Sequence, residues 1–214
     1  MEKLIFDDET HLYIGHYDIT NIKDEVVAIS NKLISDHDEV KTDGYGFYKG
    51  AIKTTKHVEI EINNNLEFIR NFGINSCIDL YSQSGKPHNL INTDCWVNVV
   101  RAKNPVQKNY TSKMNKLIFH NHVEINEINN MPKPTYTFVY YIQMPNNLSG
   151  DDGVLFIEGK NGNVYSYLPK EGDIVIMDGD LPHVPNYALD STLDRIVLAG
   201  NVGIEYSKLN NTLI

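Results

Sequence analysis

Two histidines and a glutamate alternate in a short segment of this 214-residue chain: His120, His122 and Glu124. If this segment is a β-strand, side chains two residues apart point to the same face, so the three lie side by side. Imidazole and carboxylate groups bind first-row transition metals, and two histidines with one carboxylate hold non-haem Fe(II) while leaving coordination positions open. The spacing therefore predicts that this segment builds part of a metal site.

A further ligand must come from a distant part of the chain. His183 is the best candidate, because it follows the apolar run 172–179, and Arg195 opens another apolar strand twelve residues later. We predict that the metal ligands are His122, Glu124 and His183. A competing arrangement is a three-histidine site that uses His120 in place of Glu124. If Glu124 is the ligand, His120 is interpreted as a solvent-facing strand residue.

These segments resemble a known group, the double-stranded β-helix oxygenases that depend on Fe(II) and 2-oxoglutarate, and within it the prolyl-4-hydroxylase-like branch. The resemblance spans residues 95–206. His122-Val123-Glu124 is similar to the group's His-x-Asp/Glu element, and His183 to its distal histidine. Two further segments are similar to its Tyr-Tyr-Leu strand and its Gly-Gly-x-Leu-x-Phe turn: Val139-Tyr140-Tyr141-Ile142 and Gly150-Asp151-Asp152-Gly153-Val154-Leu155-Phe156. The chain departs from the pattern where glutamate replaces the usual aspartate and where His120 precedes the pair.

The resemblance implies a mainly β fold with flanking helices, a double-stranded β-helix (jelly roll, cupin-like). It implies a dioxygenase, a hydroxylase that couples oxidative decarboxylation of 2-oxoglutarate to substrate oxidation, with Fe(II), 2-oxoglutarate and O₂ as cofactors. Arg195 matches the basic residue that holds the far carboxylate of 2-oxoglutarate, a role that suits a planar, permanently charged guanidinium. Tyr141 would face inward with Thr137 and Val139 and donate to the same carboxylate.

Several of these residues have a simpler structural interpretation. Arg195 could form a surface ion pair with a neighbouring aspartate, which contributes little stability. Tyr141 could be a core residue, Glu124 a surface carboxylate, and Trp96 is expected to anchor the core. The alternative function is a non-catalytic cupin-like or lectin-like binding module, because jelly rolls host both kinds of protein. A buried Arg195 would favour the oxygenase.

Composition narrows the class of partner. The formal net charge is −9 and the pI about 5.3, so we expect no nucleic acid as a partner, since phosphates require a basic surface. No apolar run is long enough to span a bilayer and no signal peptide is recognised, so we expect no membrane association. Two cysteines fit a reducing compartment. We therefore expect a cytoplasmic protein that acts on a small molecule or a peptide.

The pattern of apolar residues divides the chain in two. Residues 1–94 are expected to form a helical and irregular support region, and residues 95–214 the catalytic double-stranded β-helix, as one integrated domain. In the first part we expect strands at 3–6, 11–17 and 57–62, helices at 22–35 and 66–80, and loops at 36–56 and 82–94. The second helix either continues through Gly73 or is interrupted there. The eight strands expected in the second part are 95–101, 116–124, 135–144, 153–158, 163–168, 173–178, 182–188 and 195–205. The loop 103–115 and the two earlier loops are the expected lids over the site.

Overall fold

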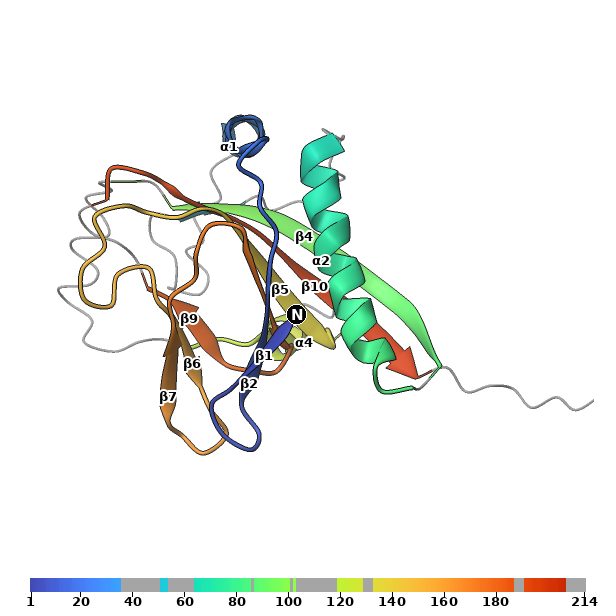
Figure 1. Ribbon diagram of the computed structural model, residues 1–214. Helices are drawn as coiled ribbons and strands as arrows, with labels where there is room; N and C mark the ends of the chain where they lie inside the picture. The colour runs from blue at the N-terminus through green and yellow to red at the C-terminus, as the bar shows by residue number, and fades with distance from the viewer. Residues whose placement is uncertain are drawn as a thin grey trace, which may run out of the picture.

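Two antiparallel sheets and a layer of helices make up the fold (Figure 1). The computed structural model describes residues 1–35, 51–53, 64–85, 87–100, 102, 119–128, 133–186 and 191–206. The expected strand 57–62 and most of the expected lids 36–56 and 103–115 lie outside these residues. None of the described helices is long and apolar enough to cross a membrane.

Within the described residues, the larger sheet has seven strands and the smaller sheet has three. In spatial order, the larger sheet consists of β1 (Glu2–Ile5), β2 (His11–His16), β8 (Asp173–Asp178), β5 (Tyr136–Gln143), β10 (Arg195–Tyr206), β4 (His88–Val100) and β3 (Ala51–Lys53). The smaller sheet consists of β7 (Val164–Tyr167), β6 (Leu155–Glu158) and β9 (His183–Pro185). This arrangement confirms the predicted jelly-roll fold, and β1 and β2 of the N-terminal region extend its larger sheet.

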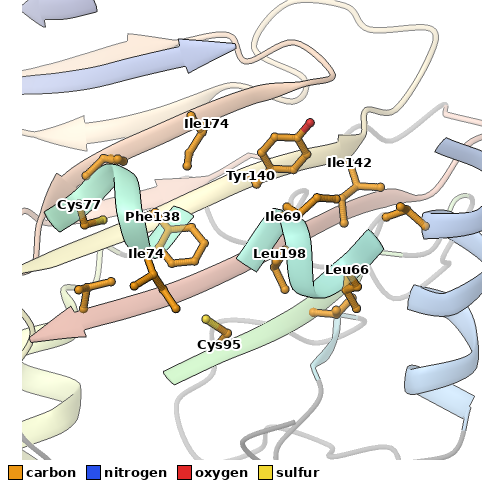
Figure 2. Packing of buried hydrophobic residues seen from close by; sticks show 14 of the residues in the cluster. Leu66, Ile69, Ile74, Cys77, Cys95, Phe138, Tyr140, Ile142, Ile174 and Leu198 are labelled. Atoms are coloured by element: carbon orange, nitrogen blue, oxygen red, sulfur yellow. The ribbon is translucent and has the colours of Figure 1, made fainter. Parts of the chain in front are cut away.

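Helices α1 (Lys23–Ser35) and α2 (Asn64–Ser82) pack on the outer face of the larger sheet (Figure 1). Figure 2 shows α2 side chains, such as Ile69, packed against Phe138 and Tyr140 of β5. Of the two alternatives at Gly73, the structure shows the continuous helix. A Cβ at Gly73 would overlap the Phe138 ring, so this glycine lets the helix approach the sheet closely.

A second apolar cluster fills the space between the two sheets. It combines Val139, Tyr141 and Val197 of the larger sheet with Leu155 and Ile157 of the smaller one. Along β5, alternate residues therefore face the helices or the interior, as the two-residue period predicted. The interior face carries the residues of the candidate site.

Two expectations about local structure are wrong. The strand predicted at 116–124 is wrong in its last part, because His120 forms only an isolated bridge and helix α4 (His122–Ile128) begins two residues later. The Asn121 side chain caps this helix, since its Oδ1 accepts a hydrogen bond of 2.8 Å from the Glu124 amide. The loop predicted at 82–94 is also wrong from His88 onward, because residues 88–94 pair with β10.

Candidate metal centre and anion pocket

Three histidine side chains converge in the described part of the chain. The ligand atoms of His120, His122 and His183 all lie within 4.8 Å of one another. His122 and His183 are 7% and 4% exposed, and His120 is half-buried. Three imidazoles that meet in a largely buried position are a donor set for a transition-metal ion, so this group could hold a metal.

Backbone hydrogen bonds bring the two histidine-bearing segments together. His120 and His183 form an antiparallel bridge, in which each amide donates to the carbonyl of the other at 3.1 and 2.9 Å. The amide of His122 donates to the carbonyl of Gly179 at 3.0 Å, which ties the start of α4 to the turn that precedes His183. Contacts between segments about sixty residues apart therefore fix the spacing of the three rings.

The protonation of His183 suits a metal ligand. Its Nδ1 lies 2.9 Å from the carbonyl oxygen of Leu181, and because a carbonyl only accepts, Nδ1 must carry the hydrogen. Burial lowers the pKa of the imidazole below its usual 6.5, so the ring is neutral at pH 7. The Nε2 lone pair is then free to bind a metal, with the ring held by its hydrogen bond to the backbone.

Glu124 does not join the histidines. It is exposed in the first turn of α4, and among the described residues the group contains His120, His122 and His183 alone. Since α4 begins at His122, the strand alternation that placed Glu124 beside the two histidines does not apply. The geometry matches the three-histidine arrangement, and a ligand role for Glu124 remains an untested prediction.

Trp96 of β4 contacts the histidine group directly. Its ring centroid lies 5.5 Å from that of His122 at an interplanar angle of 28°, a stacked arrangement. The residue is half-buried and packs against the interior cluster, in agreement with the predicted core role. Its contact with a candidate ligand was missed, because the sequence gives no sign that β4 and α4 meet.

Arg195 and Tyr141 form the second polar part of the interior. Arg195 is 5% exposed and its Cζ lies 5.4 Å from the centroid of the Tyr141 ring, which is 1% exposed. The Tyr141 hydroxyl and Arg195 Nε make no hydrogen bond with any described residue. Burial raises the pKa of the Tyr141 phenol, opposed by the nearby guanidinium, so the phenol keeps its proton and can donate. The surface ion pair considered for Arg195 is wrong, because the side chain is buried.

The strand register relates the two polar regions. Trp96 lies opposite Ala199 on β10, and the next interior residues along β10 towards its start are Val197 and Arg195. Alternate residues of a strand are about 7 Å apart, so the backbone of Arg195 lies roughly 14 Å from that of Trp96 along the strand direction. Tyr141 lies opposite Val197, between these levels. Because the guanidinium approaches the Tyr141 ring, a small elongated anion could extend from it towards the histidines.

Solved structures resemble this chain, although no family model and no curated protein sequence matches it. A prolyl-4-hydroxylase from Pseudomonas putida has a TM-score of 0.59 at 12% identity, over 90% of this chain and 91% of that one. A prolyl hydroxylase from Trichoplax adhaerens, in complex with a hypoxia inducible factor peptide fragment, has a TM-score of 0.55 at 14% identity, over 90% and 83%. The non-haem alpha-ketoglutarate dependent epimerase SnoN from nogalamycin biosynthesis has a TM-score of 0.60 at 10% identity, over 94% and 82%.

These likenesses confirm the predicted resemblance at the level of fold. The similar structures include hydroxylases and an epimerase, so the shared fold does not specify the reaction. The chain has the double-stranded β-helix fold of the 2-oxoglutarate- and Fe(II)-dependent oxygenases, including their prolyl-4-hydroxylase-like branch.

Proposed function

We propose that this protein is an Fe(II)- and 2-oxoglutarate-dependent oxygenase, a hydroxylase of a small molecule or a peptide. One observation carries the proposal: a single interior holds three convergent imidazoles and a buried arginine that forms no ion pair with any described carboxylate. A buried charge is costly unless a partner compensates it. The arginine thus favours an anionic ligand in the same interior as the metal.

The histidines would hold the metal through one nitrogen each. When bound, Fe(II) together with 2-oxoglutarate and O₂ supplies the oxidising chemistry, in which 2-oxoglutarate becomes succinate and CO₂ and the substrate gains an oxygen atom. The protein orients the ligands: the Leu181 carbonyl holds His183, and the stacked Trp96 ring restrains His122 and covers it. Three protein ligands leave positions open for other groups.

Arg195 and Tyr141 would bind the carboxylate of 2-oxoglutarate that is distant from the metal. The guanidinium can donate two parallel hydrogen bonds to a carboxylate, and the protonated phenol can donate one more. These contacts would satisfy the Tyr141 hydroxyl and Arg195 Nε, which otherwise have no described partner. The pair would therefore compensate the charge of this one carboxylate and offer it three hydrogen bonds.

A three-histidine set changes the charge of the centre. A carboxylate ligand would cancel one of the two charges of Fe(II), whereas three neutral imidazoles cancel none. Anionic ligands should therefore bind the metal more strongly than they would beside a glutamate. The set also suits Zn(II) and Cu(II), so the iron content must be controlled in any experiment.

Anaerobic titration tests the proposal. Metal-free protein is loaded with one equivalent of Fe(II), and 2-oxoglutarate is added while the weak visible charge-transfer band of the chelate is monitored. We expect a saturable band, and in air we expect succinate formation that depends on both Fe(II) and 2-oxoglutarate. Iron binding without a band or succinate would contradict the oxygenase and favour the alternative, a metal-supported jelly-roll binding module.

A further inference from the structure

We propose that Asn98 is a third side chain that binds the 2-oxoglutarate carboxylate, beside Arg195 and Tyr141. This inference rests on the proposed function. Asn98 belongs to no motif recognised in the sequence, but it lies in the sheet beside two other side chains that have unsatisfied buried polar atoms.

The strand register places Asn98 next to the other two residues. Val197 of β10 lies opposite Asn98 on one side and opposite Tyr141 on the other. Directly paired residues point to the same face of a sheet, so all three face the interior. Asn98 and Tyr141 lie on either side of Val197. Their backbones are two strand spacings apart, which is roughly 10 Å. Arg195 is the next interior residue along β10, so three polar side chains surround Val197.

All three of these side chains have a buried atom without a described partner. The atoms are Asn98 Oδ1, the Tyr141 hydroxyl oxygen and Arg195 Nε. Buried polar groups in folded proteins are nearly always hydrogen-bonded. Three exceptions around one valine therefore indicate a ligand that they share.

A carboxylate can accept hydrogen bonds from all three side chains once the Asn98 amide is turned, because the Oδ1 atom that lacks a described partner is itself an acceptor. The carboxylate offers about four lone-pair positions, which suffice for a guanidinium, a phenol and an amide that donate together. The Asn98 amide can present either its oxygen or its NH₂ group after a half-turn, since the two ends have nearly the same shape. As a neutral donor, Asn98 would strengthen anion binding without adding a second positive charge.

Asn98 also lies on the side of Arg195 that is nearer to the three histidines. Trp96 precedes it by two residues on the same face of β4, and the Trp96 ring stacks on His122. Asn98 therefore lies between the level of Trp96 and that of Arg195. A ligand that extends from the guanidinium to the metal would pass beside its amide.

The test compares two asparagines on the same strand. Asn92 lies six residues before Asn98, about 20 Å away along β4, and its Oδ1 is likewise buried without a described partner. The variants Asn98→Ala, Asn98→Asp and Asn92→Asp are loaded with Fe(II), and their 2-oxoglutarate affinity is measured anaerobically from the chelate band. Iron content is measured separately for each variant.

We expect Asn98→Ala to weaken 2-oxoglutarate binding about tenfold, as loss of one hydrogen bond to a charged group does. Asn98→Asp should weaken it by roughly 30-fold or more, because a carboxylate would face the carboxylate of the ligand. Asn92→Asp should bind like the wild type, and all three should retain iron. If Asn98→Asp does not fold, the tenfold change in Asn98→Ala carries the test.

Two results overturn the inference in distinguishable ways. If the wild type binds 2-oxoglutarate and both Asn98 variants bind it equally tightly, Asn98 does not contact the carboxylate, and the proposed function stands. If the wild type itself binds iron but no 2-oxoglutarate, the proposed function fails, and this inference fails with it.

Discussion

Two adjacent tyrosines on β5 have opposite environments. Tyr140 and Tyr141 are both almost completely buried, at 0% and 1% exposure. The Tyr140 hydroxyl faces the helices and donates a hydrogen bond of 2.7 Å to the Tyr17 carbonyl, whereas the Tyr141 hydroxyl faces the interior and has no described partner. The same residue type is thus satisfied on one face of the sheet and unsatisfied on the other.

This difference extends to the two faces of the larger sheet. The outer face is an apolar cluster formed with α1 and α2 (Figure 2). The interior face combines apolar residues with Arg195 and Asn98, which have unsatisfied buried atoms, and lies near the three histidines. Since unsatisfied buried groups reduce stability, we infer that the outer face stabilises the fold and the interior face binds ligands.

The largest expected effect concerns the metal. We expect His122→Ala, His183→Ala and His120→Ala each to lose iron, because each removes one of three ligands, whereas Glu124→Ala should retain it. Iron content is measured after desalting protein loaded with one equivalent of Fe(II). Tyr140→Phe, on the outer face, serves as a control that retains iron. Loss of iron in Glu124→Ala but not in His120→Ala would restore the two-histidine and glutamate set.

The second expected effect concerns the buried charge. Arg195→Ala should raise the 2-oxoglutarate concentration needed for half-maximal succinate formation by roughly 30-fold or more, because loss of a buried charged partner costs about 2–5 kcal/mol. Iron should stay bound. Arg195→Lys should recover only part of the affinity, since an ammonium cannot replace a bidentate guanidinium. An unchanged concentration dependence in Arg195→Ala would remove the main argument for an oxygenase.

The two tyrosines provide a matched pair of variants. Tyr141→Phe should weaken 2-oxoglutarate binding about tenfold and leave the free energy of unfolding of the ligand-free protein unchanged or slightly higher. Tyr140→Phe should lower that free energy by about 1 kcal/mol and leave the affinity unchanged, because it breaks a hydrogen bond within the protein. Urea unfolding and the anaerobic titration measure the two quantities. Equal behaviour of the two variants would contradict the assignment of different roles to the two faces.

The smallest expected effect is a pH dependence of stability. Burial lowers the pKa of His183 below 6.5, so the unfolded chain binds a proton that the folded protein resists. This contribution to stability is present above about pH 6.5 and is lost as the pH falls through the lowered folded pKa. Metal-free wild type should therefore lose more stability between pH 7.5 and 5.5 than His183→Gln in urea unfolding. Equal losses in both proteins would contradict the burial effect.

Much of the fold could be predicted from local patterns. The strands at 136–143, 173–178 and 195–206 were expected nearly at their observed bounds, because apolar residues dominate these runs and turn residues separate them from their neighbours. The two-residue period predicted that Thr137, Val139 and Tyr141 share one face, and the family resemblance implied that this face points inward. The loop expected at 82–94 failed from His88 on, because polar residues such as Asn89 and Asn92 form strand there only through pairing with β10.

The sequence by itself determined which residue types could bind a metal and an anion: His120, His122, His183 and Arg195. Only the tertiary structure decided how they combine. Asn121 caps a helix at His122 and directs Glu124 to the surface, while the bridge between His120 and His183 joins segments 63 positions apart. Asn98 gains its candidate role only through pairing with Val197, 99 positions later. Side-chain periodicity is a local property of the chain, whereas the composition of a site depends on contacts that form when distant strands pair.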